Sequence, residues 1–274
     1  MVNLNMLGSI EKFTFEDFIE IIRILRSPQG CPWDREQTHK SIRNDFIEET
    51  YEVADAIDNS DNEALCEELG DVLLQVALHS QIADDNGQFN ISDVINSVAK
   101  KMILRHPHVF SNVSVENSAE VLKNWDKIKM QEKSQSTVTD TLTSVPMAFP
   151  ALMRAAKVQK RAAKVGFDWP DLNGPMAKLT EETAELKEAL TNNNEQQIFE
   201  EFDDLLFSVV NISRFIGVNA EQALNFATNK FISRFSILEK LALERGVDIK
   251  NASLKQLDAL WDEAKECIQT DGIR

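Results

Sequence analysis

Two pairs of acidic residues, each pair spaced three apart, occur in each half of the 274-residue sequence. Residues three apart on an α-helix share one face, so each Glu-x-x-Glu or Glu-x-x-Asp pair directs two carboxylates to the same side. Crowded carboxylates repel one another unless a proton or a cation neutralises them, and hard oxygen ligands suit Mg²⁺ or Mn²⁺. The sequence therefore predicts a divalent-cation site in each half. The predicted ligands are Glu182, Glu185, Glu201 and Asp204 in the second half, with the counterparts Glu49, Glu52, Glu68 and Asp71 in the first.

The spacing between the acidic pairs predicts that each set lies on a helical hairpin. In an antiparallel hairpin, two residues lie level when they are equally far from the centre of the turn. The acidic residues of the first half are placed symmetrically about Ser60, and those of the second half about Asn193. Both centres fall in short polar segments that are typical of turns. Each hairpin is therefore expected to bring its four carboxylates level on facing surfaces.

The acidic pattern is part of an internal repeat. Segments 48–57 and 67–76 match segments 181–190 and 200–209, both at an offset of 133 residues. Glycine and proline are sparse, with 9 and 7 residues, and long stretches show helical spacing of apolar residues. The predicted fold is all-α, with two tandem helical-bundle modules. The predicted boundaries are a first module at 1–131, a Ser/Thr-rich linker at 132–149 and a second module, expected to be catalytic, at 150–274.

The overall charge restricts the classes of binding partner. The chain carries 29 Lys and Arg against 45 Asp and Glu, a formal net charge of −16. Such an acidic protein is a poor electrostatic partner for nucleic acid or an anionic membrane, and an anionic ligand would need a cation to offset the repulsion. No stretch has the length and apolar character of a membrane span, and three scattered cysteines are typical of a reducing compartment. We expect a cytoplasmic protein.

The quoted residues resemble the MazG-type nucleoside triphosphate pyrophosphohydrolases, an all-α family. The Glu-x-x-Glu…Glu-x-x-Asp pattern is the family's signature, and the resemblance also covers segments 30–39 and 106–110 and the tandem duplication. It implies Mg²⁺-dependent hydrolysis of nucleoside triphosphates to monophosphate and pyrophosphate, with Mn²⁺ able to substitute. The catalytic residues it implies, each as a metal ligand or as the base for the attacking water, are Glu182, Glu185, Glu201 and Asp204. It also implies that Lys230 and Arg234, which share a helix face, contact the triphosphate; Lys101 and Arg105 are their first-half counterparts.

Several alternatives stay open on the sequence alone. The acidic pattern is complete in both halves, and only the family precedent favours the C-terminal copy as the catalytic one. A narrow-specificity dUTPase-like pyrophosphatase and a non-catalytic helical interaction module both fit the same pattern. A two-helix hairpin cannot cover both of its apolar faces, which predicts a homodimer with the site near or across the interface. Three aromatic residues near the hairpins are expected to close small cores, namely Trp33, Phe167 and Trp169.

Overall fold

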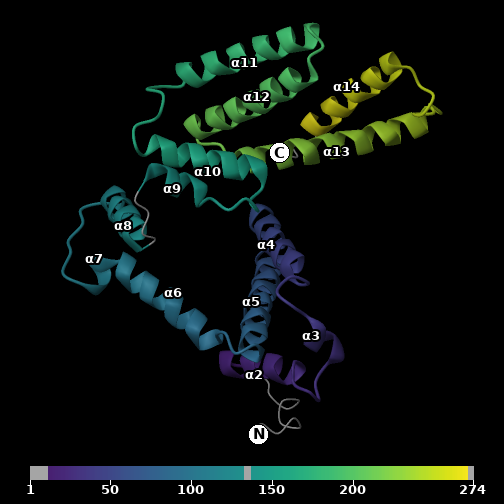
Figure 1. The fold of residues 1–274 in the computed structure, drawn as a ribbon. Coiled ribbons are helices and arrows are strands. Elements are labelled where there is room, and N and C mark those ends of the chain that lie inside the picture. Colours follow the sequence, from purple (N-terminus) through teal and green to yellow (C-terminus); the bar gives the residue numbers. More distant parts are fainter. Residues whose placement is uncertain (1–11, 133–136, 271–274) are drawn as a thin grey trace. The chain divides into compact units, whose positions relative to one another are not determined.

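The computed structural model describes residues 12–132 and 137–270, and the regular secondary structure in these ranges is helical. The chain divides into two compact units, which we call unit 1 (Met1–Lys129) and unit 2 (Met130–Arg274). Each unit carries one of the two acidic sets on a helical hairpin (Figure 1). The predicted fold of two tandem all-α modules is thereby confirmed.

The helices of unit 1 begin with α2 and end with α8, whose last residues cross the boundary between the units. Those of unit 2 run from α9 to α14. The unit 1 helices are α2 (Phe15–Leu25), α3 (Pro32–Glu36), α4 (Arg43–Asp58), α5 (Asn62–Asp85), α6 (Ile91–Arg105), α7 (Pro107–Phe110) and α8 (Ser118–Glu132). The unit 2 helices are α9 (Val138–Thr143), α10 (Ala151–Ala163), α11 (Asn173–Thr191), α12 (Glu195–Phe215), α13 (Ala220–Glu244) and α14 (Leu254–Thr270).

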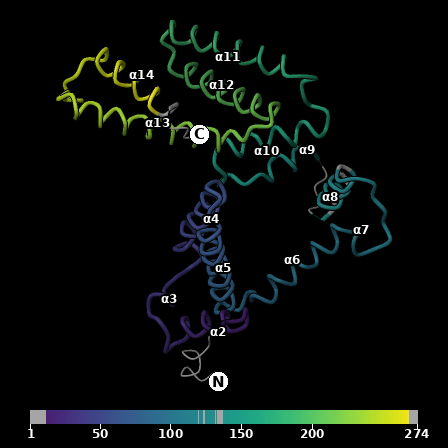
Figure 2. The backbone as a smooth tube through the Cα atoms, turned by 180° about the vertical axis from the view of Figure 1, so that it is seen from behind, coloured from purple at the N-terminus to yellow at the C-terminus, as the bar shows by residue number. Residues whose placement is uncertain are grey.

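The two acid-bearing hairpins, α4–α5 and α11–α12, turn at the residues that the spacing predicts. Ser60 and Asn193 have positive φ angles of 55° and 51°, and they are the non-glycine residues of the described chain with this backbone conformation. At the first turn, the Asp61 amide donates to the Ala56 carbonyl, which closes the end of α4 in the manner of a Schellman motif. The paired helices run side by side in both backbone views (Figures 1 and 2).

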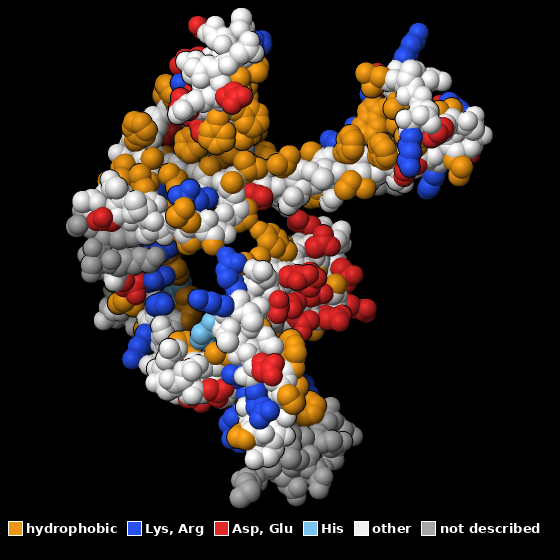
Figure 3. All heavy atoms as spheres, turned by 45° about the vertical axis from the view of Figure 1, so that its right-hand side comes forward, with side chains coloured by type: hydrophobic (Ala, Val, Ile, Leu, Met, Phe, Trp, Pro, Cys, Tyr) orange, Lys and Arg blue, Asp and Glu red, His pale blue; other side chains and the backbone are white. Residues whose placement is uncertain are grey.

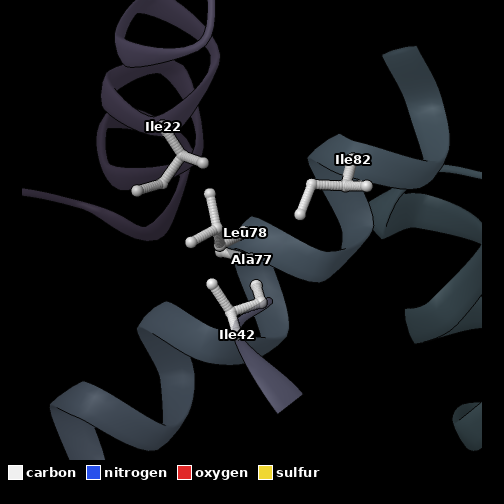
Figure 4. Packing of buried hydrophobic residues seen from close by; sticks show 5 residues of the cluster. All are labelled: Ile22, Ile42, Ala77, Leu78 and Ile82. Atoms are coloured by element: carbon white, nitrogen blue, oxygen red, sulfur yellow. The ribbon is translucent and has the colours of Figure 1, made fainter. Parts of the chain in front are cut away.

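In unit 1 the hairpin is held at its far end by α2. Ile22 of α2 and Ile42, which precedes α4, pack with Ala77, Leu78 and Ile82 of α5 (Figure 4). All five side chains are buried, so this cluster fixes the open ends of α4 and α5 against a third helix. The acidic residues lie nearer the turn of the same hairpin.

In unit 2 a separate cluster joins α13 to α14. Leu238 and Ala242 of α13 pack on Leu260 and Ala264 of α14, and all four are buried. Helix α10 packs on α12 and α13 and so links this second hairpin to the acid-bearing one. The acidic hairpin of unit 2 is therefore attached to the rest of the unit mainly through α10.

The segment predicted as a linker contains structure of its own. Helix α9 lies within it and packs on α10, where the Arg161 guanidinium donates to the Thr141 carbonyl and the Ser144 hydroxyl. Residues 133–136 of that segment lie outside the described residues. The exact module boundaries stay a prediction. No helix in the described ranges is long and apolar enough to span a bilayer.

Candidate metal and catalytic site

The α11–α12 hairpin brings carboxylates from both of its helices together. Oxygen atoms of Glu182 on α11 and of Glu201 and Asp204 on α12 lie within 4.8 Å of one another. Glu185, one turn after Glu182, forms a second such group with Glu182 and Glu181. Glu182 thus belongs to both groups and links all of the carboxylates predicted for this half.

Glu182 is the buried member of the site. Only 2% of its surface is exposed, although carboxylates are rarely buried without a partner. Its Oε1 atom lies 2.5 Å from the Nζ atom of Lys178, one helical turn earlier on α11, and accepts a hydrogen bond from that ammonium. Its Oε2 atom has no hydrogen-bond partner. A buried carboxylate oxygen without a hydrogen-bond donor lowers the stability of the fold. A cation bound to this atom would remove that cost.

The electrostatics of the site show the effect of crowding. Partial loss of hydration, followed by the negative charge of Glu182, raises the pKa of Glu185 above its ordinary value. The same two causes, in the same order, raise the pKa of Asp204. The carboxylates Glu181 and Glu182 raise the pKa of Lys178, which holds this ammonium in its charged form. The cluster therefore carries more negative charge than its single lysine offsets.

The α4–α5 hairpin of unit 1 repeats the cluster with a different supporting side chain. Oxygen atoms of Glu49, Glu52 and Glu68 lie within 4.8 Å of one another. Asp71 is outside that group, but its charge, after the loss of hydration, raises the pKa of Glu49. Gln75, 6% exposed, hydrogen bonds to Glu49 and keeps its own Oε1 without a partner. Figure 3 shows acidic side chains gathered over this hairpin.

Three residues of the two carboxylate clusters were not predicted from the sequence. Lys178 and Glu181 were not predicted for the site, although a lysine four residues before a glutamate is a recognisable helical ion pair. Gln75 could have been found from its position on α5 one turn after Asp71. None of these signals shows which acidic side chain is buried, because burial depends on neighbouring helices.

The predicted phosphate-binding pairs lie on the helices expected for them. Lys230 and Arg234 are on α13, where Lys230 is exposed and Arg234 is half-buried with its Nε atom lacking a hydrogen-bond partner. Among the described residues, no ion pair joins either of them to the carboxylates of α11 and α12. Lys101 and Arg105 are on α6, and the Arg105 guanidinium lies 5.4 Å from the centre of the Trp125 ring.

The expectation that three aromatic residues close small cores is wrong. Trp33, Phe167 and Trp169 are 61%, 83% and 47% exposed. Trp169 does lie against α11, because a side chain at Gly174 would meet its ring. Periodicity could not predict these exposures, since all three residues lie at the ends of helices or in the connections between them.

Taken together, each hairpin can hold a hard divalent cation with carboxylate oxygens. The ligands are supplied by two helices, and at least one buried oxygen in unit 2 lacks any other positive partner. Carboxylate oxygens are hard ligands, which suit hard divalent cations. Such an ion would also reduce the repulsion between this acidic surface and a polyphosphate.

Comparisons with known proteins agree with this geometry. A family model described as the MazG nucleotide pyrophosphohydrolase domain matches residues 37–110 and 173–236, so both acid-bearing hairpins fall within a match. The Thermotoga maritima nucleoside triphosphate pyrophosphohydrolase/pyrophosphatase MazG is 44% identical, over 92% of this chain and 95% of that protein. The Escherichia coli (strain K12) nucleoside triphosphate pyrophosphohydrolase is 41% identical, over 90% of this chain and 95% of that protein.

A third relative places the same module in a longer chain. The Bacillus subtilis protein YabN, described as uncharacterized, is 49% identical over 92% of this chain, which corresponds to 52% of YabN. The two family matches together cover half of the present chain, and the first two relatives match it almost from end to end. The resemblance seen in the sequence is confirmed: this chain is a tandem member of the MazG nucleotide pyrophosphohydrolase family.

Proposed function

We propose that this chain hydrolyses nucleoside triphosphates and deoxynucleoside triphosphates to the monophosphate and pyrophosphate, with Mg²⁺ held by the carboxylates of the α11–α12 hairpin. The observation that carries the proposal is the buried carboxylate of Glu182. Its Oε2 atom has no hydrogen-bond partner, and its side chain belongs to a group of three carboxylates that could bind one ion. The names of the similar proteins support the same reaction class. Mn²⁺ is expected to substitute, because it favours the same oxygen ligands.

The residues present fit a hard cation. Glu182, Glu201 and Asp204 each offer one oxygen within 4.8 Å of the others, and Glu185 offers another next to Glu182. When bound, the ion supplies charge neutralisation and polarises the α-phosphorus of the substrate. The carboxylates of Glu182, Glu201 and Asp204 would hold the ion, and Glu185 would lie beside it.

Glu185 is the carboxylate that we assign to the attacking water. It is exposed and lies outside the group formed by Glu182, Glu201 and Asp204. Its raised pKa improves it as an acceptor for a proton from water. In the reaction, the water oxygen forms a bond to the α-phosphorus as Glu185 takes the proton. The bond from the α-phosphorus to the bridging oxygen breaks, and pyrophosphate leaves.

Lys230 and Arg234 are proposed to bind the polyphosphate. They are one turn apart on α13 and so share a face. The buried Nε of Arg234 lacks a hydrogen-bond partner, which leaves a donor for a phosphate oxygen. Arginine offers a forked pair of donors to phosphate, and lysine offers a point charge.

Unit 2 is the half that we propose to be catalytic. Its central glutamate, Glu182, is buried and is held by a lysine, whereas its unit 1 counterpart Glu49 is half-buried and hydrogen bonds to Gln75. In the unit 2 cluster, Glu182 is thus paired with a cation and still has its Oε2 atom available to a metal ion. In unit 1, the loss of hydration and the nearby charges of Asp71 and Glu52 raise the pKa of Glu49, which favours its neutral form.

A cytoplasmic homodimer is the proposed form of the protein. Large hydrophobic side chains are exposed on both hairpins of unit 2, as Figure 3 shows for one face. Phe199 and Phe202 of α12 are 71% and 50% exposed, and Phe231 and Ile232 of α13 are 56% and 58% exposed. Apolar surface of this extent is typical of a protein–protein interface, and a second copy offers the same surface.

Product analysis tests the proposed reaction directly. The purified chain is incubated with Mg²⁺ and a panel of ribonucleoside and deoxyribonucleoside triphosphates that includes dUTP, and products are separated by anion-exchange chromatography. Monophosphate and pyrophosphate in equal amounts are expected. Free phosphate with diphosphate would place the cleavage at the other anhydride bond and refute the proposal. Turnover of dUTP alone would instead favour the narrow-specificity alternative.

A further inference from the structure

The two oxygens of Glu182 are in different situations. Oε1 is held by the Lys178 ammonium at 2.5 Å, and Oε2 is buried without a partner. The lysine therefore offsets the charge of the most buried carboxylate in the site while it satisfies only one of its two oxygens. A divalent cation that binds this carboxylate would be repelled by the positive charge of the Lys178 ammonium.

Lys178 is itself in a position to move. Its side chain is 41% exposed, and its ammonium also donates to Glu181 at 2.8 Å. Glu181 is exposed, so the ammonium can turn towards it or towards solvent without burying a charge. Glu182 has no such freedom, because it is almost entirely buried. When a metal ion binds, the lysine is the partner that can leave.

The first half of the chain has no equivalent of this lysine. The repeat offset of 133 residues places Asp45 at the position that corresponds to Lys178. The central glutamate there, Glu49, instead has the uncharged side chain of Gln75 and the carboxyl group of Glu52 beside it. The two hairpins share the acidic pattern, so the counter-ion is a specific feature of the α11–α12 site.

We propose that Lys178 is the counter-ion of Glu182 in the metal-free protein. A divalent cation displaces Lys178 from Glu182, and the displaced ammonium then binds the polyphosphate of the substrate. The inference rests on the proposed function and adds a coupling to it. Without substrate, Lys178 competes with the metal ion for Glu182 and weakens metal binding. With substrate present, the freed ammonium gains a phosphate partner, so metal and polyphosphate favour each other's binding. Lys178 thus affects metal binding through Glu182, and once displaced it binds the substrate directly.

The first test measures Mn²⁺ binding to the full-length, nucleotide-free protein by electron paramagnetic resonance. Every sample, including the one called wild type, carries Glu49→Gln and Glu68→Gln, so that binding by the α4–α5 hairpin is not counted. Lys178→Met is expected to bind Mn²⁺ on the order of tenfold more tightly than wild type, since a charge a few ångströms from the ion is removed. Lys178→Arg should restore the wild-type affinity. Lys187→Met removes an exposed lysine from the same helix and is the matched control, with an affinity close to that of wild type.

The second test uses the wild-type chain and does not depend on the folding of a variant. The side-chain ammonium of Lys178 is observed by ¹⁵N NMR, with its signal assigned by comparison with Lys178→Arg. An ordered ammonium is expected in the metal-free protein, and Mg²⁺ should shift the signal and make it more mobile. A signal that stays unchanged at saturating Mg²⁺ would overturn the inference.

The outcomes separate this inference from the proposed function. If wild type binds Mn²⁺ and Lys178→Met binds it equally or more weakly, the counter-ion role is refuted while the metal site stands. If wild type binds no Mn²⁺, the metal site itself is refuted. Tighter binding by Lys178→Met, with Lys187→Met unchanged, supports both.

Discussion

Replacing Glu182 by Gln is expected to stabilise the metal-free protein while it removes activity. The carboxylate has one buried oxygen without a donor, and such an atom costs about 1–3 kcal/mol. Against this, its ion pair is with a lysine whose side chain is 41% exposed, and a pair of that kind contributes about 0–1 kcal/mol. An amide can donate to the neighbouring carboxylates of Glu201 and Asp204. The net expectation is a gain of about 1 kcal/mol in the free energy of unfolding.

Thermal melts followed by circular dichroism, with a chelator or with millimolar Mg²⁺, measure this effect. In chelator, a gain of about 1 kcal/mol corresponds to a rise in Tm of about 2–4 °C. In Mg²⁺ the order should reverse, because only the wild type gains the free energy of metal binding. Glu188→Gln, an exposed position on the same helix, is the control and should leave Tm nearly unchanged.

A lower Tm for Glu182→Gln in chelator would refute this reasoning. It would mean that Lys178 and the surrounding helices already stabilise the Glu182 charge more than its unpartnered oxygen costs. Pyrophosphate release that persists in the variant would separately refute Glu182 as a ligand of the catalytic ion.

Four further expectations follow from the structure. Glu201→Gln should reduce pyrophosphate release by at least about 100-fold while Glu68→Gln leaves it close to wild type, and the reverse pattern in a coupled pyrophosphate assay would assign catalysis to unit 1. Ser60→Gly should raise the free energy of unfolding by roughly 1 kcal/mol in urea titrations, because Ser60 holds a φ of 55° that glycine adopts more readily; an unchanged midpoint would contradict this. The pKa of Glu185 is raised in the folded state, so in chelator its contribution to stability grows as pH falls through that raised pKa and levels off below the ordinary glutamate pKa. Urea midpoints of Glu185→Gln should lack this component, and identical pH profiles would exclude it. Phe202→Asp should convert the proposed dimer to monomer in multi-angle light scattering, whereas a wild type that is already monomeric would refute the dimer.

The hairpins were predictable because their signals are local. The symmetric spacing of the acidic pairs placed the turn centres at Ser60 and Asn193, and the structure has a left-handed backbone conformation at both. Helical periodicity and the length of the repeat are properties of the chain itself, and they do not depend on which other helices pack nearby. The all-α fold and the family could therefore be predicted without coordinates.

The internal arrangement of each cluster was less predictable. The spacing treats the four carboxylates of a hairpin as equivalent, but the structure brings Glu182, Glu201 and Asp204 together and places Glu185 with Glu181. In unit 1 it is Asp71 that lies outside the closest group. Side-chain rotamers and the tilt of one helix against the other decide such distances, and neither is encoded in residue spacing.

Residue types and their order along the chain thus established the helices, the turns, the tandem repeat and the acidic signature. The packing of helices established that Glu182 is buried, that Lys178 is its partner, and that Trp33 and Phe167 are exposed. The physical reason is that the helical period depends on local backbone geometry, whereas burial and charge pairing depend on surfaces contributed by residues distant in the chain.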